Sequence, residues 1–62
     1  MYPQRHPVAT RGAFTIHRGK LSRDDSRAFW GEGPAGDGRI APLASFWNEG
    51  DARRWLAERV TA

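Results

Sequence analysis

The side chains best suited to chemistry in this chain are basic and lie in its first half. They are Arg5, Arg11, Arg18, Lys20, Arg23 and Arg27. Such groups bind phosphate oxygens or carboxylates, so the set predicts contact with nucleic acid or with an acidic protein surface. His17 is expected on an exposed strand face, where it could contact a phosphate or a base edge. Phe29, or Trp47 if it is not stapled to the helix, could stack on a base or contact a protein, although each could instead serve the core or the staple.

Charge is unevenly distributed along the sequence. The formal net charge is +3 at pH 7, yet residues 1–23 carry five basic side chains and no acid, and residues 24–38 carry four acids and one arginine. The basic excess therefore falls on the N-terminal arm and the first strand, where a polyanion could bind. Solubility alone also explains a net charge of this size, and both interpretations stay open.

Catalytic and metal-binding chemistry has little support. The chain has no cysteine, and Ser22, Ser26 and Ser45 lack a His and an Asp at the spacing of a nucleophilic triad. Asp24 and Asp25 are adjacent without a third ligand nearby, which favours a turn over a cation site. The two histidines are isolated, which argues against zinc. We therefore predict a binding protein that is not an enzyme and needs no metal or cofactor.

Size and composition predict one small domain. A chain of 62 residues buries only about 60% of its unfolded surface. Three Trp, three Phe and one Tyr must supply the core without disulfides, and a homodimer is a further possibility. The chain lacks both an apolar run of spanning length and a signal-peptide pattern, so we expect a cytoplasmic protein that does not enter membranes.

Residues 1–12 are predicted to be a flexible basic arm, and residues 13–62 a single domain. Residues 13–18 alternate as a strand, with Phe14 and Ile16 on one face and Thr15 and His17 on the other. Turn-forming residues follow at 19–25.

A second strand is predicted at residues 27–31, antiparallel to the first. It places Trp30 on one face and Phe29 on the other, so one aromatic face needs a further cover. The glycine-rich run 31–38 predicts a flexible loop. Residues 39–46 are a third strand candidate. Pro42 either pushes this strand to a sheet edge or interrupts it, because proline has no N–H for the ladder, and the strand is therefore predicted at 43–46.

The C-terminal helix has clear start signals. Asn48 is a favoured N-cap, so the helix is predicted to begin at Glu49, with Asp51 also in its first turn. Trp47 and Ala52 have the sequence spacing of a hydrophobic staple. The apolar stripe consists of Ala52, Trp55, Leu56 and Val60. It is expected to pack against Phe14, Ile16, Trp30 and Phe46.

These elements predict an α+β fold, a three-stranded antiparallel sheet with one C-terminal amphipathic helix packed on one face. The run from Ala44 to Leu56 resembles the strand, turn and helix ending of small β-β-β-α domains, including the arm-type DNA-binding domains of phage and transposon integrases. The resemblance covers about a fifth of the chain. It implies that the sheet contacts DNA while the helix supports it.

Two functions follow from these observations. The first is a small non-enzymatic protein of phage or mobile-element origin that binds nucleic acid through the basic hairpin and arm. The alternative is a stoichiometric inhibitor that blocks the nucleic-acid site of a host protein complex. In small size and lack of catalytic residues the chain also resembles anti-CRISPR proteins.

Overall fold

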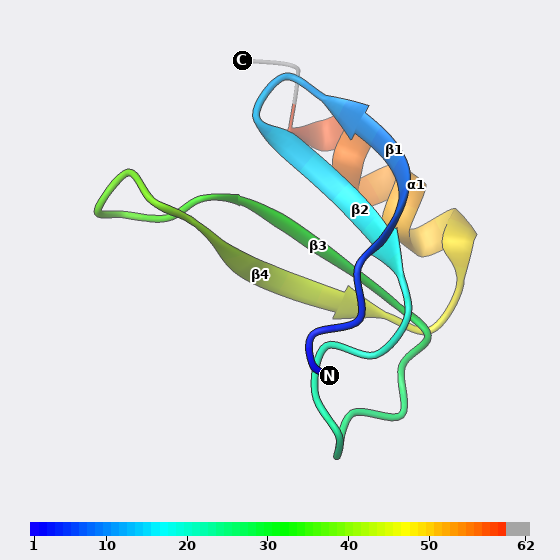
Figure 1. Ribbon diagram of the computed structural model, residues 1–62. Helices are drawn as coiled ribbons and strands as arrows, with labels where there is room; N and C mark the ends of the chain where they lie inside the picture. The colour runs from blue at the N-terminus through cyan, green and yellow to red at the C-terminus, as the bar shows by residue number, and fades with distance from the viewer. Residues whose placement is uncertain (60–62) are drawn as a thin grey trace.

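A four-stranded antiparallel sheet carries one helix on one of its faces (Figure 1). The computed structural model describes residues 1–59. The elements are β1 (His6–Arg11), β2 (Phe14–Arg18), β3 (Phe29–Pro34), β4 (Ile40–Phe46) and α1 (Glu49–Glu58), and the strands lie in the order β1-β2-β3-β4. The predicted α+β class, antiparallel sheet and C-terminal helix are confirmed. The predicted number of three strands is wrong.

The additional strand is β1, which lies inside the predicted arm. It pairs with β2 from His6 opposite Arg18 to Arg11 opposite Phe14. Gly12, with φ of 58°, takes the first place of the two-residue turn between them, as a type II′ hairpin requires. Pro7 weakens the strand signal in the sequence, but β1 is an outer strand, where a missing N–H is tolerated.

The second hairpin is longer than predicted and projects beyond the rest of the sheet (Figure 1). β3 continues through Gly31 and Gly33 into the predicted loop, and β4 begins at Ile40. The ring of Trp55 lies over Gly31, where an added Cβ would be 2.5 Å from Trp55 Cζ3. Gly33 has Phe14 above it in the same way. These glycines therefore permit close packing inside a strand and do not mark a loop.

The start of α1 is confirmed at Glu49. Asn48 adopts an extended conformation, and its Oδ1 accepts a hydrogen bond of 2.8 Å from the backbone N–H of Asp51. Asn48 Nδ2 also contacts Asp51 Oδ2 at 3.3 Å. Trp47 is 63% exposed, so it does not serve as the staple that its spacing from Ala52 predicts.

The core lies between α1 and one face of the sheet. Its buried members are Ile16, Ala52, Trp55 and Leu56, and partly buried apolar side chains surround them, namely Val8, Ala9, Phe14, Phe29, Ala44 and Phe46. Trp55 contacts the rings of Phe14 and Phe46, with centroids 6.0 and 5.5 Å away. Val60, predicted in the helix stripe, lies outside the described residues.

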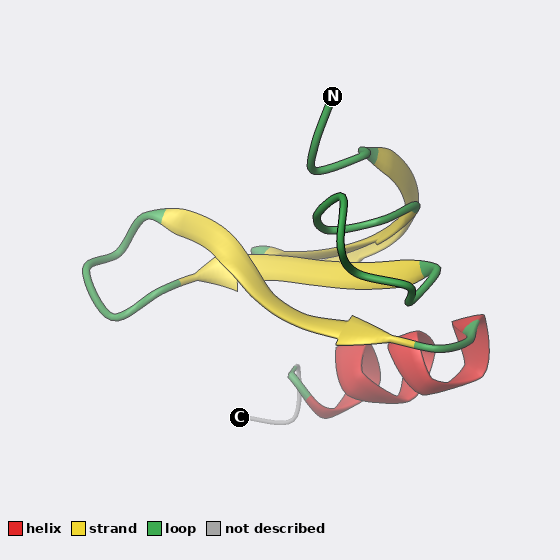
Figure 2. Ribbon diagram, turned by 90° about the horizontal axis from the view of Figure 1, so that it is seen from below, coloured by secondary structure: helices red, strands yellow, loops and turns green. Residues whose placement is uncertain are grey.

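Trp30 is not part of this core, so its predicted place under the helix is wrong. It pairs with His17 across the β2–β3 ladder and shares the opposite face of the sheet with it. The N-terminal segment passes over that face, so the helix and this segment lie on opposite sides of the sheet (Figure 2). The second cover that the two-faced aromatic strand requires is therefore supplied by residues of the predicted arm.

Candidate nucleic-acid interface

Five of the six predicted basic residues belong to segments that come together at one end of the sheet. The strand register aligns His6, Arg18, Phe29 and Phe46 in one row across the four strands, and this row marks the end. Arg5 precedes the row, Lys20 and Arg23 lie in the loop 19–28, and Arg27 leads into β3. We call Arg5, Arg18, Lys20, Arg23 and Arg27 the basic end.

Arg11 does not belong to the basic end. It pairs with Phe14 at the other end of the β1–β2 hairpin. The four residue steps from Phe14 to Arg18 span about 13 Å at 3.3 Å per step, which separates Arg11 from Arg18 by at least that distance along the sheet. Arg11 and Arg5, both in the predicted arm, therefore lie toward opposite ends of the sheet.

Hydrogen bonds hold the loop that carries Lys20 and Arg23. Gly19 N–H donates to Ala28 O at 2.7 Å, which closes the base of the loop. The backbone of Lys20 is joined to Gln4 twice, through Gln4 N–H to Lys20 O at 2.9 Å and through Lys20 N–H to Gln4 Oε1 at 2.8 Å. The Asp25 carboxylate accepts from the backbone N–H of Arg27 at 2.9 Å, the turn role predicted for it. The loop thus presents its cations from a hydrogen-bonded framework.

Within residues 1–59, three cations of the basic end have no counter-ion. No carboxylate within residues 1–59 forms an ion pair with Arg18, Lys20 or Arg23. All three residues are exposed. Several acids of the chain have other partners. Glu32 pairs with Arg5, Glu49 pairs with Arg53, and Asp37 accepts a hydrogen bond from the backbone N–H of Arg39. The positive charge of the three is therefore available to an external anion.

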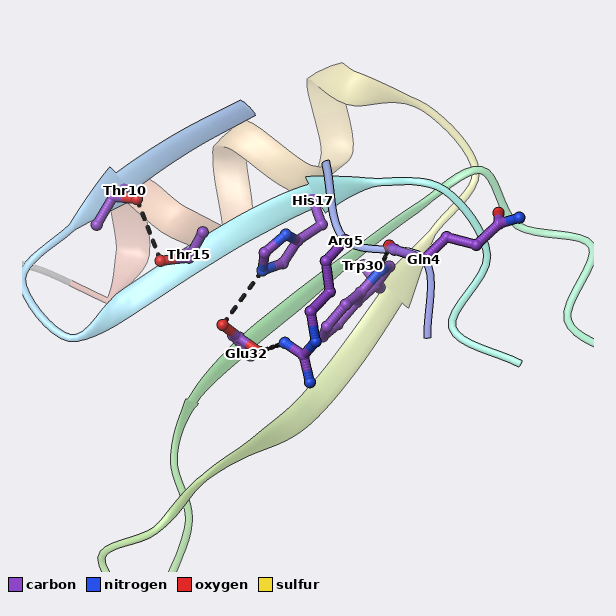
Figure 3. A network of polar contacts seen from close by, with 7 residues as sticks. All are labelled: Gln4, Arg5, Thr10, Thr15, His17, Trp30 and Glu32. Atoms are coloured by element: carbon purple, nitrogen blue, oxygen red, sulfur yellow. Dashed lines mark hydrogen bonds and ion pairs between the residues drawn. The ribbon is translucent and has the colours of Figure 1, made fainter. Parts of the chain in front are cut away.

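Arg5 is different because its guanidinium is paired within the protein. Its Nη1 donates to Glu32 Oε1 at 2.5 Å, and its Cζ lies 5.2 Å from the centre of the Trp30 ring (Figure 3). Burial raises the pKa of Glu32, but Arg5 and His17 together outweigh burial and hold that pKa below its ordinary value of 4.5. The predicted role of Arg5 as a phosphate ligand is therefore offset by a structural role.

His17 is 4% exposed, so its predicted place on an open strand face is wrong. It does lie opposite the helix side, as the alternation requires, but the N-terminal segment covers that face. The imidazole stacks on Trp30 with 4.4 Å between centroids, and its Nε2 lies 3.2 Å from Glu32 Oε2 (Figure 3). Neither ring nitrogen has a well-aligned hydrogen bond within the described chain. His17 cannot reach an external ligand in this conformation.

Trp47 follows β4 at the basic end and is 63% exposed, whereas Phe29 is half-buried against the helix-side core. Arg27 Cζ lies 5.2 Å from the centre of the Trp47 ring. The sequence does hold a signal for this exposure. The only staple partner at the right spacing is Ala52, whose single methyl offers too little surface to bury an indole ring.

Residues 1–59 contain no group of three potential metal ligands from His, Cys, Asp and Glu. An open hollow is lined by His6, Pro7, Val8 and Arg18, beside the basic end. Of the helices that the structure describes, none is long and apolar enough to cross a bilayer.

Comparisons of the chain with protein-family models, with curated proteins and with solved structures find no match. The residues themselves therefore carry the functional argument.

Proposed function

We propose that this protein binds nucleic acid through the basic end. The observation that carries the proposal is the exposure of Arg18, Lys20 and Arg23 at one end of the sheet, with no carboxylate of the described chain paired to them. The loop that bears two of them is held by backbone hydrogen bonds, so little ordering is needed on binding. This placement favours the loop end over the sheet face that the resemblance to integrase domains implied. The Gln4–Arg5 segment already covers part of that face.

The proposal sets the expected salt dependence. Each phosphate neutralised on duplex DNA lowers the slope of log K against log salt by about 0.9. Three contacts from Arg18, Lys20 and Arg23 give a slope of about −2.7, so affinity should fall about 40-fold between 50 and 200 mM monovalent salt. Contacts from Arg27 would steepen the slope further.

The test compares two double variants of equal charge. Lys20→Ala with Arg23→Ala removes two cations from the basic end, and Arg11→Ala with Arg39→Ala removes two from the opposite end of the sheet. The affinity for a labelled oligonucleotide is measured by fluorescence anisotropy over a range of salt concentrations. For the first variant the slope of log K against log salt should be less negative by about 2, as expected for two lost phosphate contacts. The second variant should keep the slope of the original protein. Equal losses in the two variants would contradict a localised interface.

A second candidate function is the stoichiometric inhibitor of a nucleic-acid-handling complex. The projecting β3–β4 hairpin supports it, because Ile40 and Leu43 are 55% and 42% exposed there. Apolar side chains on a protruding hairpin suit a protein surface better than a phosphate backbone. An inhibitor should form an isolable complex with one host protein assembly, and Ile40→Ser with Leu43→Ser should abolish the complex while leaving oligonucleotide affinity unchanged. Capture that survives both substitutions would argue against this function.

A further inference from the structure

Trp47 is the only one of the three tryptophans that the fold leaves in solvent. Trp30 is fully buried and Trp55 is 9% exposed, whereas Trp47 is 63% exposed. An indole of this exposure contributes little to the core. The two residues next to Trp47 are fixed in place, because Phe46 packs against Trp55 and Asn48 caps the helix. The backbone on both sides of Trp47 is therefore held, with the ring directed outward.

Arg27 is positioned over the Trp47 ring by contacts at both ends of the residue. Its Nη1 donates to Ser45 Oγ at 2.9 Å, and its backbone N–H donates to Asp25 Oδ1 at 2.9 Å. The guanidinium carbon then lies 5.2 Å from the ring centre. The hydroxyl of Ser45 does not neutralise the guanidinium, so its positive charge stays available to a phosphate. The pair thus joins a flat aromatic surface to a cation in fixed geometry.

We propose that Trp47 and Arg27 form a stacking site for an unpaired base, so that the ligand of the basic end is single-stranded nucleic acid. This inference rests on the proposed function. A base within a duplex has both faces occupied by its neighbours, whereas an unpaired base can stack on the face of the exposed Trp47 indole opposite Arg27. Arg27 would hold the adjoining phosphate, and Arg18, Lys20 and Arg23 would follow the strand. Stacking of one base is worth roughly a 5- to 150-fold change in affinity.

The test measures affinity for a labelled 12-nucleotide oligothymidine and for a blunt duplex, both at 50 mM salt. The unaltered protein should bind the single strand more tightly. Trp47→Ala should weaken single-strand binding at least fivefold and leave duplex binding unchanged, and Trp47→Phe, which keeps an aromatic face, should retain most of the affinity. Acrylamide quenching of tryptophan fluorescence is also measured on the unaltered protein. Oligothymidine should shield the exposed tryptophan from acrylamide quenching, and the duplex should not.

The outcomes separate this inference from the proposed function. Binding of both ligands with equal affinity, unaffected by Trp47→Ala and without protection from acrylamide, would overturn the stacking site and leave phosphate binding by the basic end intact. Absence of binding to either ligand at 50 mM salt would overturn both.

Discussion

The contact between Gly31 and Trp55 makes a quantitative prediction about packing. A Cβ placed on Gly31 would lie 2.5, 2.8 and 3.0 Å from the Cζ3, Cη2 and Cε3 atoms of Trp55. Carbon atoms pack best at about 3.5 to 4.0 Å, so the ring would have to withdraw by about 1 Å. The ring has little room to do so, because it is 9% exposed and contacts Phe14 and Phe46.

The expected cost of Gly31→Ala follows from two opposing effects. Overpacking of a core costs about 1 to 3 kcal/mol. Loss of backbone freedom in the unfolded chain returns about 0.4 to 1 kcal/mol. The net loss in free energy of unfolding should be about 1 to 2 kcal/mol. In a domain of this size that lowers the melting temperature by roughly 4 to 16 °C.

Gly36→Ala is the matched control. Nothing lies within 4 Å of an added Cβ at Gly36, and its φ is not positive. The same gain from the unfolded state applies there without overpacking, so this variant should be as stable as the original protein or slightly more stable. Thermal and urea unfolding, followed by far-UV circular dichroism, measure both variants. If Gly31→Ala melts at the same temperature as Gly36→Ala, the argument from ring contact is wrong.

Two further predictions concern the Glu32 pairing and the helix cap. Since the folded pKa of Glu32 is below 4.5, its pairing stabilises the protein above that pH, and this stabilisation is lost as the pH falls through the folded pKa. Glu32→Gln should therefore unfold at lower urea than the original protein at pH 7, and the difference should shrink in acid; a difference that grows in acid would refute the pairing. Asn48→Ala should cost about 1 kcal/mol of unfolding free energy, measured by urea unfolding at pH 7, whereas Asn48→Ser keeps an acceptor for the Asp51 N–H and should cost much less. Equal losses in the two cap variants would show that the side-chain acceptor is not what stabilises the helix start.

Elements governed by neighbouring residues were the easiest to predict. The start of α1 at Glu49 depends on the Asn48 side chain and a backbone N–H three residues away, and the alternation of Phe14 to His17 is a property of β2 alone. The glycines of β3 predict a loop when the sequence is considered alone. Gly31 instead makes room for the Trp55 ring, which is distant in sequence.

The sequence indicates only in part where the candidate site residues lie in the fold, for the same reason. The basic residues were identified by type, but their grouping depended on strand register, which places Arg18 at one end of β2 and Arg11 beyond the other. The burial of His17 could not be predicted from its own strand. The Gln4–Arg5 segment covers it, and that segment is held by contacts with Trp30 and Glu32 of β3.

The sequence by itself therefore determined the helix, its cap and the alternating faces of β2, through local interactions, and the number of cations, through composition. Tertiary structure decided which face each aromatic occupies, made a strand from residues 6–11 and left Trp47 in solvent. The physical reason is that caps and alternation involve groups a few bonds apart, whereas burial depends on what the rest of the chain places above a residue. Pairing of Trp30 with His17 assigned both to the face opposite the helix, and the N-terminal segment then covered them.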